Sequence, residues 1–265
     1  MLDTILIIGC GNMGGAMLAG WLASGIAPSR FTVVDPVLAE APQGVTLLRD
    51  LPQGARFDLV MLGIKPQMLA DLAPTIAPFV GAETTLLSIL AGAEVATLAR
   101  LFPEAGGRVR IMPNLSAAIG KSPIALATQD LDADRQAAVT ALMDPLGTPE
   151  WLPEEQFDIV TALAGSGPAF VYRFIDALAA GATALGLDAG QAQRLALATV
   201  EGASLLAAAS EHSPGELARR VASPGGTTQA GLDVLDADGA LAKLAQATLK
   251  AAADRNAEMA KAICG

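Results

Sequence analysis

Short apolar runs alternate with segments of helical periodicity along the first half of the chain. The apolar runs occupy residues 4–9, 31–35, 58–63, 84–90 and 108–113. Hydrophobicity that continues without alternation is typical of strands covered on both faces. The intervening segments predict helices at 12–24, 66–78 and 93–102, and a further strand pair at 123–128 and 148–152 encloses a helix at 131–142. This order predicts a doubly wound parallel sheet with right-handed crossovers.

The pattern changes after residue 152, and no strand is predicted from there to the end of the chain. Helices are predicted at 154–163, 168–185, 188–209, 213–221, 228–237 and 239–262. Asp188 and Ser213 stand where N-cap residues are expected. We therefore expect an α/β domain at 1–152, followed by an all-α domain at 153–265.

The predicted helices of the second domain are apolar around much of their circumference. A domain of this size cannot bury so much apolar surface by itself. The surplus predicts a subunit interface, so the all-α domain is expected to be a dimerisation domain. A homodimer built on the helices within 168–209 is the simplest assembly, because most soluble oligomers are symmetric homo-oligomers.

Composition and charge narrow the class of protein. Hydrophobic residues make up 52% of the chain and charged residues 17%, which excludes a disordered chain. The net charge of −10 argues against nucleic acid as a partner, since a phosphate backbone would have to be neutralised. The most apolar stretches, 168–186 and 191–209, contain charged residues, so no membrane span is predicted.

The cysteines and the first residues bear on location. Cys10 and Cys264 are the two cysteines of the chain, which provides neither a disulfide framework nor a zinc cluster. The first residues lack the basic region and the apolar length of a signal peptide. We therefore expect a cytoplasmic protein with no bound metal.

A glycine-rich loop follows the first predicted strand and precedes the first helix. Gly9, Gly11 and Gly14 form the pattern GxGxxG, with Asn12 and Met13 inside it. The first glycine allows the tight turn, the second lets the backbone approach a pyrophosphate, and the third allows the helix to pack closely on the strand. The N–H groups at the start of the helix then face the anion. The context predicts a Rossmann-type dinucleotide site, and the alternative is a turn needed only for packing.

The acidic residue expected downstream of such a loop is Asp35, at the end of the second strand. A carboxylate there accepts hydrogen bonds from the ribose hydroxyls of NAD and repels the 2′-phosphate of NADP. No Arg or Lys follows directly, and the position of Arg30, just before the strand, depends on the fold. This reasoning favours NADH, and the alternative is that Asp35 merely caps the turn.

Two further loops follow strands at the same predicted edge of the sheet. Lys65 and Pro66 lie in GIKPQ (63–67), and Met112, Pro113 and Asn114 begin the loop at 112–121. Ligands of open parallel sheets bind outside the carboxyl ends of the strands, so both loops are expected beside the cofactor. Asn114 could supply an amide partner to the nicotinamide. The alternatives are a solvated surface lysine at 65 and a proline that only terminates a strand.

Residues 223–228 read SPGGTT and separate two predicted helices. If the second helix begins near Thr227, the N–H groups of Gly226, Thr227 and Thr228 have no partner within the helix and can bind an anion. The glycines let the backbone come close to a ligand. The alternative is a helix connection, with proline and glycine as breakers and threonine as the N-cap.

Five stretches, taken together, resemble the pyrroline-5-carboxylate reductase family. They are IGCGNMGGAM, GIKPQ, IMPN with the later GKS, TALAGSGPAF and ELARRVASPGGTTQAGLDVL, which occur in the family's order and spacing over essentially the whole chain. The last is far more specific than a dinucleotide fingerprint. The chain departs from the family pattern at Ser116, where proline is common, at Ser122, and at Gly63-Ile64, where Ala-Val is usual.

The resemblance implies the reduction of the cyclic imine of 1-pyrroline-5-carboxylate to L-proline with NAD(P)H. It implies a homodimer, with decamers in some members, and active sites between the cofactor domain and helices that include the partner's. Family members often use NADPH, which conflicts with the interpretation of Asp35, so both NADPH and NADH remain open.

The resemblance also implies roles for individual residues. Thr228 would form a hydrogen bond with the ring nitrogen, and Ser223 with the backbone of Gly225, Gly226, Thr227 and Thr228 would hold the substrate carboxylate. Glu211 and Lys65 are further polar candidates near the reaction, Lys65 also as a catalytic group.

Hydride transfer to an iminium needs little acid or base catalysis, which is consistent with a chain whose one histidine, His212, is expected merely to begin a helix. Two alternatives remain: a Rossmann dehydrogenase of another small carboxylate substrate, and a nucleotide-sensing protein without catalysis. A 3-hydroxy acid dehydrogenase would carry a catalytic lysine on the helix at 168–185, where this chain has none.

Overall fold

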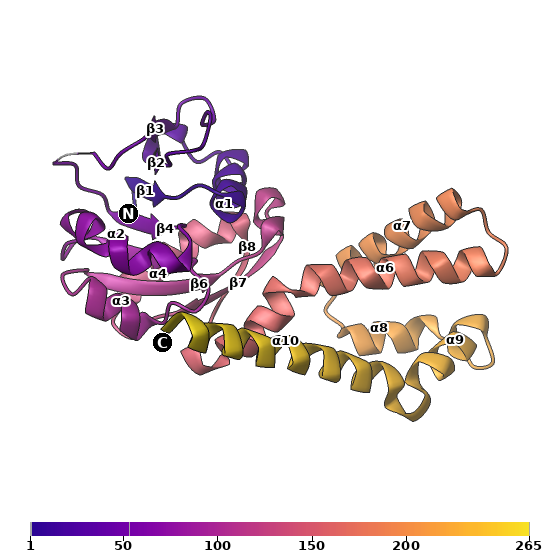
Figure 1. Ribbon diagram of the computed structural model, residues 1–265. Coiled ribbons are helices and arrows are strands. Elements are labelled where there is room, and N and C mark those ends of the chain that lie inside the picture. Colours follow the sequence, from indigo (N-terminus) through magenta and orange to yellow (C-terminus); the bar gives the residue numbers. More distant parts are fainter. Residues whose placement is uncertain (1, 53, 265) are drawn as a thin grey trace. The chain divides into compact units, whose positions relative to one another are not determined.

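The computed structural model describes residues 2–52 and 54–264, with side chains as far as residue 258. Its contacts divide the chain into two compact units, shown in Figure 1. One unit contains the residues up to 165 together with those from 252 onward, and the other contains residues 166–251. The expected domain boundary between residues 152 and 153 is a different division of the chain, and it stays a prediction.

The first unit is built on one sheet. Its strands are β1 (Ile5–Ile8), β2 (Phe31–Val34), β3 (Thr46–Leu48), β4 (Leu59–Leu62), β5 (Thr85–Ser88), β6 (Gly107–Met112), β7 (Ser122–Ala127) and β8 (Gly147–Trp151). They lie in the order β3-β2-β1-β4-β5-β6-β7-β8. Strands β2 and β3 are added on one side of β1, and the later strands are added on its other side. The topological switch point, where open sheets bind nucleotides, therefore lies at β1.

Two features of the sheet differ from the expectation. β7 pairs with β6 in the antiparallel direction, which was not predicted within the doubly wound parallel sheet. The connection between them contains only the short helix η4 (Leu115–Ile119), and a parallel pair needs a much longer crossover. β3 was not predicted, because it has three residues and is partly exposed at the edge of the sheet.

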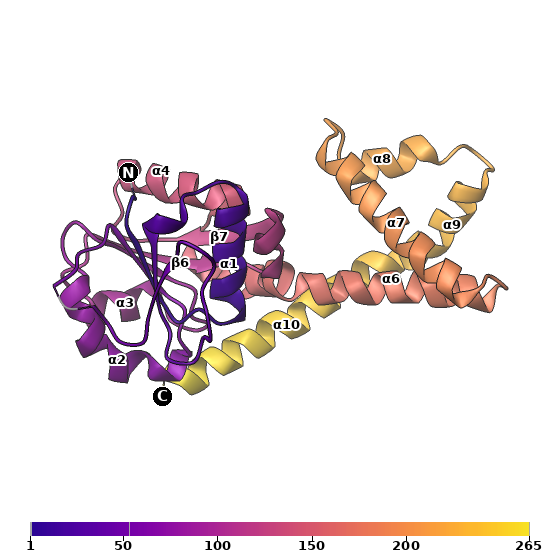
Figure 2. The same ribbon diagram turned by 90° about the horizontal axis from the view of Figure 1, so that it is seen from above.

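Helices cover both faces of the sheet, as Figure 2 shows. They are α1 (Asn12–Ala23), α2 (Leu69–Ile76), α3 (Val95–Leu101), α4 (Ala133–Met143) and α5 (Phe157–Val160). Short helical turns lie at Pro28–Arg30, Pro66–Met68, Ala77–Phe79, Asp144–Leu146 and Glu154–Gln156, and the π-helical turn η7 at Thr161–Gly165. The helix predicted at 66–78 is therefore α2 with a short turn at each end. The helix predicted at 154–163 is mainly α5 and the start of η7.

The alternate residues of β1 belong to different cores. Ile5 and Ile7 face the core formed with α1 and α4, while Leu6 and Ile8 face the core formed with α2 and α3. Trp21 of α1 is fully buried in the first core, where its indole N–H donates to the carbonyl of Leu142 at 2.7 Å. Burial on both faces explains the continuous apolar runs of the strands.

The second unit is helical throughout. It contains α6 (Gly167–Ala184), α7 (Ala189–Ala208), α8 (Pro214–Val221), α9 (Thr227–Asp236), the turn Ala237–Gly239 and the first part of α10 (Ala240–Cys264). The predicted N-caps are confirmed, because Asp188 accepts from the N–H of Gln191 and Ser213 from that of Glu216.

Large apolar side chains of α6 and α7 are exposed. They include Val171, Tyr172, Phe174, Leu178, Leu195, Leu197, Leu205 and Leu206. The buried hydrophobic residues of this unit are three alanines, Ala179, Ala192 and Ala196, so the described chain does not enclose a core here. No helix among the described residues has both the length and the hydropathy to cross a membrane.

Candidate active site

The glycine loop has the geometry that a dinucleotide requires. Gly9 has φ +84°, and a Cβ at this position would lie 2.8 Å from the carbonyl oxygen of Gly63, so a side chain is excluded on both grounds. The space around the Cβ position of Gly11 is empty within 4 Å. A ligand can therefore approach the backbone closely at Gly11.

The start of α1 is left without internal partners. The first helical hydrogen bond runs from the N–H of Gly15 to the carbonyl of Gly11 at 2.8 Å, and no side chain caps the helix. The N–H groups of Asn12, Met13 and Gly14 precede that bond and have no helical acceptor. These groups and the open face of Gly11 fit the pyrophosphate of a dinucleotide.

Asp35 is turned into the protein at the end of β2. It is 6% exposed, and its carboxylate accepts hydrogen bonds from the N–H groups of Cys10, Val37 and Leu38, each at 2.9 Å. Burial by itself would raise the pKa of Asp35, but these backbone N–H groups and the charge of Arg49 lower it below its ordinary value. Asp35 thus caps its turn and ties it to the glycine loop, which is the alternative considered from the sequence.

Cys10 and Arg30 were the other residues of interest near this turn. Burial, with the charge of Asp35, raises the pKa of Cys10 to about 11, so its thiol stays protonated and unreactive near neutral pH. Arg30 lies before β2, where it donates to the carbonyl of Asp3 and pairs with its carboxylate at 3.5 Å. It therefore stands at the opposite end of the strand from Asp35.

The fold brings the other predicted loops to the same edge of the sheet. Gly9 follows β1, Lys65 and Pro66 follow β4, and Met112 ends β6, all at the carboxyl ends of mutually parallel strands. The loops after β1 and β4 are in direct contact, since the N–H of Gly63 donates to the carbonyl of Ile8 at 2.8 Å. Lys65 is exposed, and its contact with a cofactor stays a prediction.

Asn114 is held inside the protein. Its side-chain oxygen accepts from the N–H of Ser116 and its amide nitrogen donates to the carbonyl of Ala164, both at 2.9 Å, while the hydroxyl of Ser122 accepts from its backbone N–H. It is 5% exposed. The described contacts therefore make Asn114 a bridge between its loop and η7, and a contact between its amide and the nicotinamide stays a prediction.

The loop before α9 has the shape of an anion site. α9 begins at Thr227 without a side-chain cap, and its first helical bond joins the N–H of Ala230 to the carbonyl of Gly226. The N–H groups of Thr227, Thr228 and Gln229 therefore have no helical acceptor. The expectation is corrected at Gly226, whose N–H donates to the carbonyl of Ser223 at 2.9 Å and closes the turn instead.

The backbone favours glycine at position 225 of that turn, and at position 226 a side chain would displace the Ser223 hydroxyl. Gly225 has φ +70°, and a Cβ on Gly226 would lie 2.5 Å from the hydroxyl oxygen of Ser223. Thr227, Thr228 and Ser223 are exposed. Glu211 is also exposed, in the turn between α7 and α8. No group of three or more His, Cys, Asp or Glu side chains in the described part of the chain is arranged to hold a metal.

Known proteins resemble this chain over nearly its whole length. A family model described as pyrroline-5-carboxylate reductase dimerisation matches residues 154–259, and one described as NADP oxidoreductase, coenzyme F420-dependent, matches residues 4–92. The pyrroline-5-carboxylate reductase of Pseudomonas aeruginosa is 34% identical, with 97% of each chain covered. That of Methanosarcina acetivorans is 34% identical over 96% of this chain and 97% of its own.

The chain belongs to the pyrroline-5-carboxylate reductase family.

Solved structures of the family agree with this assignment. The reductase from Coxiella burnetii is 30% identical with a TM-score of 0.90, and covers 97% of this chain and 98% of its own. That from Streptococcus pyogenes is 30% identical with a TM-score of 0.74, and 98% of each chain is covered. The predicted family, the Rossmann-type sheet followed by an all-α domain, and the class of NAD(P)H-dependent oxidoreductase are confirmed.

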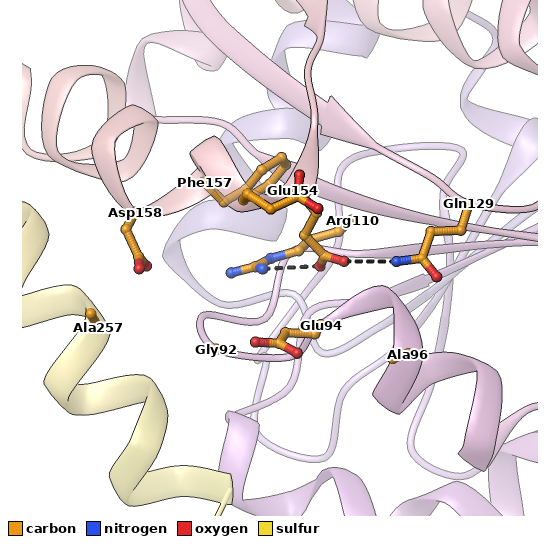
Figure 3. Close-up of a pocket in the computed structure, with 10 residues that line it drawn as sticks. Gly92, Glu94, Ala96, Arg110, Gln129, Glu154, Phe157, Asp158 and Ala257 are labelled. Atoms are coloured by element: carbon orange, nitrogen blue, oxygen red, sulfur yellow. Dashed lines mark hydrogen bonds and ion pairs between the residues drawn. The ribbon is translucent and has the colours of Figure 1, made fainter.

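One cluster of side chains in this protein was missed from the sequence. Arg110 of β6 and Glu154 line a cavity of about 470 Å³. Figure 3 shows their side chains in contact. The guanidinium and the carboxylate are 3.0 Å apart, and Glu154 also accepts from the N–H of Val95 at the start of α3, at 2.9 Å. The guanidinium carbon of Arg110 lies 4.6 Å from the centre of the Phe157 ring.

These contacts hold Glu154, the first residue matched by the dimerisation family model, against β6 and the start of α3. Arg110 is 5% exposed, and its Nε has no hydrogen-bond partner. The signal for it was present in the sequence, because Arg108 and Arg110 interrupt an otherwise apolar strand. Buried arginines need carboxylate or carbonyl partners, so such a strand implies a buried acidic residue elsewhere in the chain.

Proposed function

We propose that the protein reduces 1-pyrroline-5-carboxylate to L-proline with NAD(P)H. The observation that carries this proposal is the turn at 223–228, where three helix N–H groups without helical acceptors stand beside an exposed hydroxyl. An anion beside such a helix start gains roughly 0.3–1 kcal/mol, and up to about 2 in a partly buried site. The substrate has a single carboxylate, which this turn can hold. It also has a ring nitrogen that the hydroxyl of Thr228 can reach.

The reaction needs few side chains. NAD(P)H supplies the hydride when it is bound at the carboxyl edge of the sheet. The protonated imine of the substrate accepts the hydride at its ring carbon, the C=N π electrons move to nitrogen, and a neutral secondary amine results. Positioning is the main task of the protein, since the cationic nitrogen already activates the carbon.

Residues of the helical unit hold the substrate in this proposal. Ser223 and the backbone N–H groups of Gly225, Thr227 and Thr228 bind the carboxylate. The hydroxyl of Thr228 orients the ring nitrogen by a hydrogen bond and does not act as an acid, because its pKa is far too high. Glu211 is a further polar candidate for this site.

The other predicted site residues belong to the cofactor. Gly9, Gly11, Asn12, Met13 and Gly14 hold the pyrophosphate. The residues nearer the nicotinamide are Lys65, Pro66, Met112, Pro113 and Asn114. Asn114 contributes by fixing the conformation of its loop.

The assembly and the location are part of the proposal. We infer a homodimer, and a decamer is the larger assembly to be distinguished from it. The cytoplasm is the proposed location, which rests on the cysteine content.

An assay with both cofactors tests the function. Purified protein is mixed with pyrroline-5-carboxylate and either NADH or NADPH, and the loss of absorbance of the reduced nicotinamide is followed. We expect oxidation that depends on the imine, and none when a 3-hydroxy acid is offered with the oxidised cofactor. Turnover of the hydroxy acid instead would favour the dehydrogenase alternative, and binding of cofactor without oxidation by any substrate would favour a nucleotide sensor.

A further inference from the structure

An exposed arginine lies at the edge of the sheet where the adenosine end of a dinucleotide is expected. Arg49 directly follows β3, which pairs in parallel with β2 so that Leu48 lies opposite Val34. Arg49 and Asp35 therefore leave the sheet side by side, although they are 14 residues apart. None of the stretches that carry the family resemblance includes Arg49.

The guanidinium of Arg49 is fastened to the turn after β2. One terminal nitrogen donates to the carbonyl of Asp35 at 2.9 Å and to that of Leu38, and the other donates to the carbonyl of Ala39 at 3.3 Å. A guanidinium has five N–H donors, so two remain beyond these three bonds. The side chain is exposed, which leaves the remaining donors within reach of an anion.

The carboxylate of Asp35 is buried and bonded to the backbone at this edge, and its repulsion of a phosphate stays a prediction. A carboxylate that selects NADH must offer its oxygens to the ribose hydroxyls. Here both oxygens of Asp35 accept backbone N–H groups and the residue is 6% exposed. Glu40 and Asp50, the acidic residues nearest to the turn in sequence, are exposed, so solvent and salt screen their charge.

We propose that Arg49 binds the 2′-phosphate of NADPH and makes this protein prefer NADPH to NADH. The proposal rests on the proposed function in that it concerns the cofactor of the same site. Arginine is suited to the task because its planar fork can donate to two phosphate oxygens at once.

Binding of nucleotide fragments tests the proposal without any turnover. The affinities of 2′,5′-ADP and 5′-AMP, which differ by the 2′-phosphate, are measured by calorimetry for the wild type and for Arg49→Ala, Arg49→Lys and Arg56→Ala. Arg56 is exposed and lies before β4, at the other end of the strands, so its variant controls for the lost charge. We expect the wild type to bind 2′,5′-ADP at least tenfold more tightly than 5′-AMP.

The variants separate a phosphate contact from a structural role. Arg49→Ala should weaken 2′,5′-ADP by about ten- to a hundredfold and leave 5′-AMP within about twofold, as expected for a lost charge-assisted hydrogen bond. Arg49→Lys should lie between, and Arg56→Ala should match the wild type. Equal weakening of both fragments would show that Arg49 only supports the turn, and an unchanged ratio would also overturn the proposal. Either result leaves the reductase assay untouched, whereas absence of imine reduction would overturn the proposed function itself.

Discussion

Thr228 has two proposed roles at one position of the helix start. Its backbone N–H belongs to the set without a helical acceptor, and its side chain is exposed beside the glycine turn. A hydroxyl is the smallest side chain that can orient a ring nitrogen without filling the space that the glycines leave. The two roles can be separated, because substitution removes the hydroxyl and keeps the N–H.

Replacing Thr228 by alanine should lower turnover with pyrroline-5-carboxylate by about 10- to 100-fold, the effect of one hydrogen bond to the reacting group. Affinity for NADPH, measured by fluorescence titration, should not change. Thr228→Ser keeps the hydroxyl and should retain most of the turnover. If alanine weakened turnover and cofactor binding equally, the loop would be structural.

At the scale of elements, the site depends on how closely helix α1 approaches η4, the turn that follows the loop at 112–114. A Cβ on Gly20 of α1 would lie 2.1 Å from the carbonyl oxygen of Ala117 and 2.7 Å from the Leu146 side chain. On the same helix, a Cβ on Gly15 would have its nearest neighbour at 3.9 Å. A side chain is therefore excluded at Gly20 and tolerated at Gly15.

Gly20→Ala should destabilise the protein by about 1–3 kcal/mol, because the helix and η4 must move apart. Gly15→Ala should instead stabilise it by about 0.5–1 kcal/mol through helix propensity. Urea unfolding at one fixed protein concentration measures both changes. Equal midpoints for the two variants would contradict the close packing of α1 on η4.

At the scale of the whole molecule, the helical unit has an apolar stripe along α6. Val171, Phe174 and Leu178 recur at intervals of three and four residues, Leu185 follows directly after the helix, and all four are exposed. Such a stripe is typical of a helix that packs against another helix. The family model that matches this part of the chain is described as a dimerisation domain, so a second copy of the chain is the expected partner of this stripe.

Leu178→Glu should weaken the dimer by about 100-fold or more, because a carboxylate would be buried in the interface without a partner. Ala180→Glu adds the same charge at an exposed position on another side of α6 and should leave the assembly intact. Sedimentation velocity over a range of concentrations measures both. A wild-type species much larger than a dimer would indicate the decamer, and an unaffected Leu178→Glu assembly would place the interface elsewhere.

The sequence by itself determined the features that depend on local periodicity and backbone conformation. These include the strands of the sheet core, the helices from α6 to α10, the N-caps at Asp188 and Ser213, and the glycine loop before α1. They could be predicted because apolar spacing, capping and glycine turns act within a few residues. Motif order also carried the family assignment.

Only the tertiary structure decided the environment of the polar side chains. Asp35 turns inward because Cys10, 25 residues away, presents an N–H to it, and Arg49 reaches its turn because β3 pairs with β2. Asn114 is committed to Ala164, 50 residues away. Residue type shows which hydrogen bonds a polar group can make. Its actual partners depend on how distant segments pack. A buried polar group without a partner is costly, so packing must provide one.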